Sequence, residues 1–259
     1  MSGLGRSRVR GAPEAILVGL AFAFVTAFFS LLAIPFAILV PDRGVPIVAR
    51  RWARAALAVA GVEVELARVG ALPAGAVVVM ANHTSHFDVV ALYAALPIAV
   101  RMVAKRELTL IPIFGWALAL GGAIIIDRGK RERAIASIER AGKVIRRGAS
   151  VVLFPEGTRT PPGVLGPLKK GPFHLAQSAQ VAVLPIGVEG TGEILKKGDW
   201  RIHPGRVRLC VGEPVGPFPG GDSDTAREAL MGAVAEALTR LGNLRAEDGF
   251  SLDTAGRDP

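Results

Sequence analysis

The segment AVVVMANHTSHFDVVALYAAL, residues 76–96, sets the architecture of this 259-residue chain. Its first part, Ala76–Ala81, is a short apolar run rich in β-branched residues, which predicts a buried strand. Its last part, Val89–Leu96, is apolar and reads as a helix, and the stretch between them is mostly polar. In open α/β sheets functional side chains collect where the carboxyl end of a strand turns into a helix. Residues 82–88 therefore form a candidate functional turn.

The same alternation of strands and helices continues along the chain. Further short apolar runs bounded by Gly, Pro or charge predict strands at Ala123–Ile126, Val151–Phe154, Val181–Ile186 and Val207–Val211. Apolar residues at helical spacing, with stop signals such as Gly148 and Gly242, predict helices at Arg131–Arg147, Pro172–Gln180 and Thr225–Leu241. This order predicts an α/β sheet with helix-covered faces.

The N-terminal region carries a different signal. Residues 15–41 are uncharged without interruption, which is long enough to span a bilayer. Pro35 lies inside this run and should kink or end its helix. The next segment, Val45–Val62, has an apolar face at helical spacing, with Arg50, Arg51 and Arg54 on its other faces, as in an interfacial helix.

Three arrangements of this region stay open at this stage: a helix pair dipping into one leaflet, a single span, and a buried soluble helix. Arginines flank the apolar run on both sides, so the distribution of positive charge gives no orientation. We expect a membrane-associating helical segment at residues 1–62, an α/β domain at 63–242, and an acidic tail without regular structure at 243–259.

Composition and charge exclude several classes of protein. Half of the residues are hydrophobic, which excludes a disordered chain. Cys210 is the only cysteine, so a disulfide framework and a cysteine-built zinc site are excluded, and we expect no metal. The net charge of +9 predicts an anionic partner, either a phosphorylated ligand or an anionic lipid surface. Nucleic acid is not expected, because the chain is strongly apolar and has no zinc-finger or RRM signature.

His83 and Asp88 are the first candidate catalytic pair. They lie five residues apart, about 140° from alignment on one continuous helix, so they meet only if Thr84-Ser85 forms a turn between them. Such a pair would be a general base with its orienting carboxylate. Ser85-x-x-Asp88 also resembles a capping box, in which Asp88 would only cap a helix.

A second group of polar residues follows another predicted strand. Phe154-Pro155-Glu156-Gly157-Thr158-Arg159 has a glycine for close backbone approach and an arginine fork suited to phosphate. Lys169-Lys170-Gly171 precedes a helix start, where amide groups favour anions. Lys105 and Asp127-Arg128 lie upstream of both.

In order along the chain, four motifs resemble those of the glycerolipid acyltransferase family. They are Asn-His-x-Ser-x-x-Asp at 82–88, Ile-Asp-Arg at 126–128, Phe-Pro-Glu-Gly-Thr-Arg at 154–159 and Leu-Pro-Ile at 184–186. The branch that the chain resembles is the bacterial 1-acyl-glycerol-3-phosphate acyltransferases. Ile125 stands where that family usually has Phe, and Thr160 where it usually has Ser, which leaves the subfamily open.

The resemblance implies a fold and a set of roles. The sheet would be mixed, and the protein would lie at the cell membrane with its catalytic domain on the cytoplasmic side. His83 would be the general base and Asp88 its orienting partner. The substrate-binding residues would be Arg128, Glu156, Gly157, Arg159 and Lys105, with Pro185 shaping the acyl-donor site.

The implied reaction is acyl transfer to lysophosphatidic acid, which yields phosphatidic acid. The donor would be acyl-CoA or acyl carrier protein as co-substrate, with no cofactor. Two alternatives remain: an acyltransferase for another lysolipid, such as lyso-ornithine lipid or a lysophospholipid, and a non-catalytic membrane-anchored lipid-binding protein.

Overall fold

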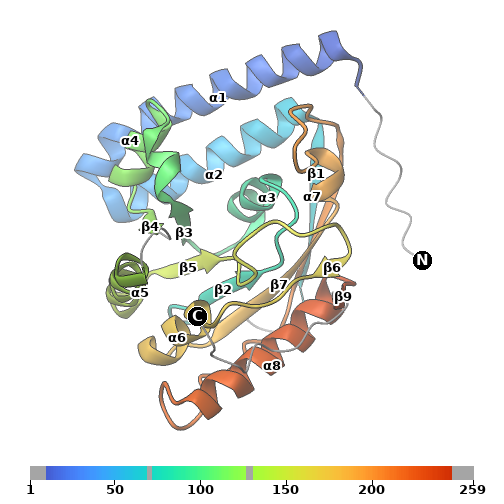
Figure 1. Ribbon diagram of the computed structural model, residues 1–259. Helices are drawn as coiled ribbons and strands as arrows, with labels where there is room; N and C mark the ends of the chain where they lie inside the picture. The colour runs from blue at the N-terminus through green and yellow to red at the C-terminus, as the bar shows by residue number, and fades with distance from the viewer. Residues whose placement is uncertain (1–9, 69–71, 127–130, 247–259) are drawn as a thin grey trace.

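The computed structural model describes residues 10–68, 72–126 and 131–246 (Figure 1). Its main sheet has seven strands among these residues, in the order β1-β8-β7-β2-β5-β3-β4. The strands are β1 (Val62–Arg68), β2 (Val78–Ala81), β3 (Val100–Lys105), β4 (Ile124–Ile126), β5 (Ser150–Leu153), β7 (Val183–Glu189) and β8 (Gly205–Val211). The strand at residues 76–81 is therefore confirmed, and it occupies the middle of the sheet.

The sheet is mixed, as expected. β2 pairs in parallel with β5 and β7, while β7 and β8 run antiparallel. β3 pairs in parallel with both β5 and β4. The carboxyl ends of β2, β3, β5 and β7 consequently lie along one side of the sheet, which we call the catalytic edge.

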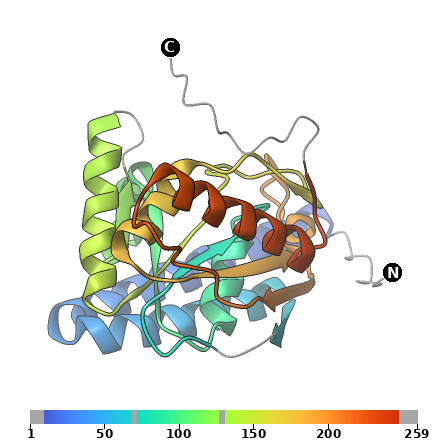
Figure 2. The same ribbon diagram turned by 90° about the horizontal axis from the view of Figure 1, so that it is seen from below.

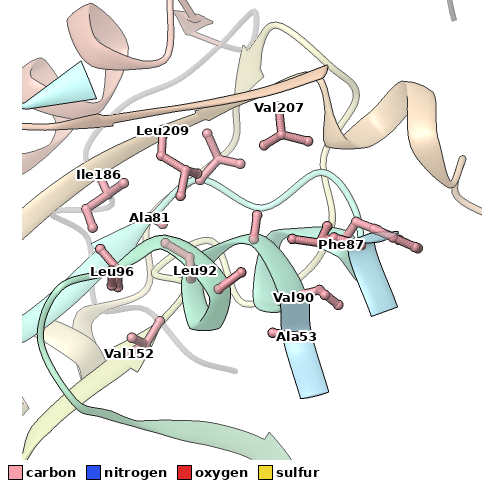
Figure 3. Packing of buried hydrophobic residues seen from close by; sticks show 14 of the residues in the cluster. Ala53, Ala81, Phe87, Val90, Leu92, Leu96, Val152, Ile186, Val207 and Leu209 are labelled. Atoms are coloured by element: carbon pink, nitrogen blue, oxygen red, sulfur yellow. The ribbon is translucent and has the colours of Figure 1, made fainter. Parts of the chain in front are cut away.

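Helices cover both faces of the sheet (Figure 2). On one face lie α2 (Pro41–Ala60) and α3 (Phe87–Ala95); on the other lie α5 (Arg131–Arg146), α6 (Lys170–Ala179) and α8 (Asp224–Leu241). Successive side chains of a strand point to opposite faces of the sheet. Val79 and Ala81 of β2 therefore pack on the side of α2 and α3, whereas Val78 and Met80 pack on the side of α5, α6 and α8. Figure 3 shows the first core, where Phe87, Leu92 and Leu96 of the α3 region pack against Ile186 and Leu209.

The apolar N-terminal run forms α1 (Ala12–Leu39), a helix long and apolar enough to cross a membrane. Most of its apolar window is not buried, which excludes the interpretation of α1 as a soluble core helix. Pro35 does not end the helix, since α1 continues to Leu39 and α2 begins at Pro41. Pro35 was expected to kink or end its helix, and the expectation that the helix ends there is wrong.

The second N-terminal helix is confirmed, but its apolar face is used differently from the prediction. Ala53, Ala56 and Leu57 of α2 are buried in the core that contains α3, rather than facing a lipid surface. α1 lies over α2 and is joined to it by the Trp52 indole, which donates to Thr26 Oγ1 at 3.2 Å. The helices of residues 12–60 are therefore packed against the α/β unit (Figure 1).

Regular structure at the C-terminal end extends past residue 242, where the α/β domain was expected to end. The α8 helix begins after Ser223, whose hydroxyl accepts a hydrogen bond from the Ala226 amide at 3.3 Å. β9 (Arg245–Ala246) then pairs with β6 (Val164–Leu165), so ordered structure continues beyond Gly242. The rest of the predicted tail, residues 247–259, lies outside the described residues.

Candidate active site

The predicted functional turn lies on the catalytic edge, between β2 and α3. His83 follows β2, and Asp88 is in the first turn of α3. Their side chains meet as predicted, with His83 Nδ1 at 2.7 Å from Asp88 Oδ2. Because the carboxylate can only accept, Nδ1 carries the proton and Nε2 is left as the basic nitrogen. The imidazole also stacks on the Phe154 ring, with 4.0 Å between ring centroids.

Asp88 is completely buried and holds the turn together as well as orienting His83. Its Oδ2 accepts from the amides of Thr84 at 2.8 Å and Ser85 at 3.0 Å. Its Oδ1 accepts from the hydroxyl of Thr191, which in turn lies 2.8 Å from Thr84 Oγ1. The same carboxylate thus contacts both His83 and the backbone amides of the turn, so its geometry is compatible with the capping and the catalytic interpretations alike.

Glu156, at the end of β5, lies beneath the same turn. Its Oε1 accepts a hydrogen bond from the His83 amide at 3.0 Å, and its side chain is 2% exposed. Its Oε2 has no hydrogen-bond partner in the part of the chain that is described. Burial raises the pKa of Glu156 to about 7, against partial compensation by the Thr160 hydroxyl and the His83 amide.

The remaining residues of this motif shape an electropositive surface. Gly157 has a φ of 72°, a conformation that favours glycine. The guanidinium of Arg159 makes no ion pair with a described residue, and the Arg159 carbonyl accepts from Lys197 Nζ at 3.0 Å. Desolvation and then the charge of Arg159 lower the pKa of His86, and Lys105 contributes in the same direction. Both cations thus lie near the catalytic turn.

Lys105 ends β3 and is exposed at the catalytic edge. Pro185 is buried in β7 opposite Met80 of β2, inside the sheet rather than on its surface. The Lys169 amide donates to the Pro155 carbonyl at 2.8 Å, which brings the start of α6 next to the Glu156 turn. Arg128 lies outside the described residues.

Two contacts of the turn with the β7 end were not predicted. Asn82 exchanges two hydrogen bonds with the backbone of Val188, at 2.9 and 2.7 Å. Thr191, at the start of the short helix α7 (Thr191–Ile194), supplies the hydroxyl to Asp88. Asn82 is part of the first family motif, so the sequence pointed to it as a site residue. For Thr191 the sequence offered only its position after a predicted strand.

The apolar cavity of the structure lies away from the His83–Asp88 pair. Among the described residues, no three His, Cys, Asp or Glu side chains are grouped to hold a metal ion. An apolar cavity of about 100 Å³ lies between α1, α2, β3 and α4 (Phe114–Leu120), and neither His83 nor Asp88 lines it. The His83 side chain is 15% exposed and is the accessible member of the pair, since Asp88 is fully buried.

The chain is similar to known acyltransferases. The family model described as Acyltransferase matches residues 63–189, a span that contains His83, Asp88, Glu156 and Arg159. The chain is 34% identical over 170 residues to 1-acyl-sn-glycerol-3-phosphate acyltransferase of Pseudomonas aeruginosa, covering 64% of this chain and 65% of that protein. It is 33% identical over 162 residues to a chloroplastic enzyme of the same name from Brassica napus, covering 62% and 46%.

A solved structure shares the fold. The crystal structure of the 1-acyl-sn-glycerophosphate (LPA) acyltransferase from Thermotoga maritima matches with a TM-score of 0.72 at 23% identity, covering 91% of this chain and 99% of that one. The chain spans only about half to two thirds of the curated relatives named above. The motifs, the fold and the family match agree, and the chain belongs to the glycerolipid acyltransferase family that includes the 1-acyl-sn-glycerol-3-phosphate acyltransferases.

Proposed function

We propose that this protein transfers a fatty acyl group from an acyl thioester to the free hydroxyl of 1-acyl-glycerol-3-phosphate. The observation that carries the proposal is the 2.7 Å contact of His83 with the buried carboxylate of Asp88, in a turn on which the charges of Arg159 and Lys105 act. The pair suits proton abstraction, and the cations suit a phosphorylated acceptor. The relatives named for this reaction support the same assignment.

In the proposed reaction, His83 Nε2 takes the proton of the acceptor hydroxyl while that oxygen attacks the thioester carbonyl. Asp88 stabilises the resulting imidazolium. The tetrahedral intermediate then collapses: the carbon–sulfur bond breaks, the thiolate takes the proton from His83, and the new ester remains. A thioester is activated enough for direct transfer, and the sequence contains no Gly-x-Ser-x-Gly nucleophile elbow.

The contacts of α1 support catalysis at a membrane surface. The Phe22 ring of α1 lies 5.6 Å, centroid to centroid, from Phe87, which immediately precedes Asp88. A helix held this close to the catalytic turn brings the site to the level of the lipids. Since α1 lies along α2 and the α/β unit, the proposal favours a helix pair in one leaflet over a single span, with the catalytic domain on the cytoplasmic side. Acyl-CoA and acyl carrier protein, both soluble there, remain the two candidate donors.

Arg159 is assigned to the acceptor phosphate. We expect Arg159→Ala to lower kcat/KM for lysophosphatidic acid about tenfold to a hundredfold, the loss of a charge-assisted hydrogen bond. Transfer to a phosphate-free monoacylglycerol should change much less. Arg240→Ala, on the exposed last turn of α8, is the matched control. Equal losses with both acceptors would contradict a phosphate contact.

Thr191 is assigned as a positioning residue, because it reaches the acceptor only through Asp88. We expect Thr191→Val to lower kcat about tenfold or more, since it removes a hydrogen bond to a buried carboxylate. The KM for lysophosphatidic acid should not change, and Thr191→Ser should restore kcat. Wild-type kcat in the Thr191→Val variant would contradict a positioning role for Thr191.

The proposed acceptor is tested by offering one labelled acyl thioester to lysophosphatidic acid and to lyso-ornithine lipid in detergent micelles. Acylation of lysophosphatidic acid alone supports the proposal. Acylation of lyso-ornithine lipid instead would retain the chemistry and move the protein to the alternative lysolipid substrate. Binding of lysolipid without transfer, from either donor, would favour the non-catalytic alternative.

A further inference from the structure

Exposed apolar surface is concentrated on one part of the molecule. Among the described residues, the large apolar side chains that are exposed belong to α1 with its link to α2, to Ile47 of α2, and to residues 110–120, with Trp200 as the exception. α1 is the membrane helix of the proposed function. Residues 110–120 form a second exposed apolar group, outside α1 and α2.

The segment that contains them is formed by the 3₁₀ helix η1 (Arg106–Leu110) and by α4. No charged residue occurs between Glu107 and Asp127. Leu110 is 78% exposed and Trp116 59% exposed, and Ile111 and Leu120 are exposed as well. An apolar group of this size on a surface marks a binding site for a partner or a membrane.

The exposed side chains of this segment lie on a different side from those that pack inside the molecule. Phe114, Ala117 and Leu118 of α4 line the apolar cavity together with Phe29 and Ala33 of α1, so α4 has a separate inner side. The two helices pack against each other at one end of the molecule (Figure 1). The exposed side chains Trp116 and Leu120 therefore belong to a helix that packs directly on α1.

The position of the segment links it to the catalytic edge. η1 begins directly after Lys105, the last residue of β3, whose charge acts on His86 in the catalytic turn. Lys105 and Arg106 are both exposed at this point. The sequence thus runs from a basic site edge into an apolar surface, an order that fits lipid headgroups followed by acyl chains.

We propose that residues 106–120 form a second membrane-inserting element, which enters the same leaflet as α1. The proposal rests on the membrane association in the proposed function. Its occupant is the lipid bilayer, because α4 packs against α1, a helix of membrane-spanning hydropathy whose own apolar side chains are exposed. Trp116 lies at the interface, where the indole ring is favoured. With α1 and η1–α4 both inserted, the site edge at Lys105 is held at the headgroups, and a lysolipid is acylated without leaving the leaflet.

The insertion is measured with full-length protein whose only tryptophan is Trp116, obtained by Trp52→Phe and Trp200→Phe. The protein is added to vesicles of equal parts phosphatidylcholine and phosphatidylglycerol, with or without bromine on the upper acyl chain. We expect Trp116 emission to shift to shorter wavelength, to lose most of its intensity in brominated vesicles, and to become inaccessible to iodide. The control carries Trp116→Phe and Glu236→Trp in addition, which moves the reporter to the exposed side of α8.

The outcomes distinguish failure of this inference from failure of the membrane association in the proposed function. If the protein floats with the vesicles while Trp116 is quenched no more than the reporter on α8, the inference is overturned and the membrane role of α1 stands. If the wild-type protein does not float with the vesicles, membrane association itself fails, and the inference fails with it.

A second variant keeps the native tryptophans. Leu110→Cys, labelled with an environment-sensitive dye, probes the most exposed apolar side chain of the segment, and the native Cys210 is buried from the reagent. A shift of dye emission to shorter wavelength on vesicle addition is expected. An emission unchanged from that in water would contradict the insertion.

Discussion

His83→Ala is expected to lower turnover about 10²–10⁴-fold, the contribution of a positioned general base. The substitution removes the imidazole whose Nδ1 contacts the buried carboxylate of Asp88. Its Nε2 is the nitrogen that would take the proton. The His83 amide still donates to Glu156, so the turn should keep its backbone contacts. The rate is measured as phosphatidic acid formed from lysophosphatidic acid and a labelled thioester, after circular dichroism has established folding.

The chain supplies a matched control for this variant. His174 of α6 forms an ion pair with Asp222, outside the catalytic edge. His174→Ala removes a histidine with an acidic partner, and we expect it to keep wild-type turnover. Wild-type rates from His83→Ala itself would exclude the general-base role.

Asp88→Asn is expected to be nearly as damaging as loss of the base. With the amide oxygen at the Oδ2 position, asparagine still accepts from the Thr84 and Ser85 amides and from His83, so the turn is kept. The negative charge that stabilises the imidazolium is lost, and we expect kcat to fall about 10²–10⁴-fold. Steady-state kinetics at saturating acceptor measures this effect, and the KM should change little.

Asp222→Asn, the equivalent change in the His174 pair, is the control and should leave kcat unchanged. Asp88→Ala should in addition lower the melting temperature, because it leaves two amides and the Thr191 hydroxyl without their acceptor. If Asp88→Asn retained full kcat, Asp88 would be a helix cap alone.

Much of the sheet could be predicted because its central strands are uniformly apolar. β2 and β5 are buried at every position and read clearly as short apolar runs. β1 and β3 were missed for the opposite reason. β1 lies at the edge of the sheet and contains Glu63, Glu65 and Arg68, and the side chains of β3 alternate between buried and partly exposed. Their strand character comes from pairing with β8 and β5, which no local pattern records.

The candidate site was predictable to the same limited extent. His83 and Asp88 lie close in sequence, so a single turn brings them together. The contacts of Glu156 with the His83 amide and of Thr191 with Asp88 join residues 73 and 103 positions apart. Such contacts depend on strand order, with β2 between β5 and β7, and the sequence pattern contains no strand order.

The most direct test of direct acyl transfer by His83 is a single-turnover measurement with purified wild-type protein and lysophosphatidic acid in micelles. Phosphatidic acid and free thiol are quantified together, with acyl-CoA and with acyl carrier protein as donors. We expect equal amounts of both products from at least one donor, no acyl group bound to the protein, and both products formed about 10²–10⁴-fold more slowly by His83→Ala. A wild-type rate of product formation in His83→Ala, or no product from the wild type with either donor, would contradict direct transfer by His83.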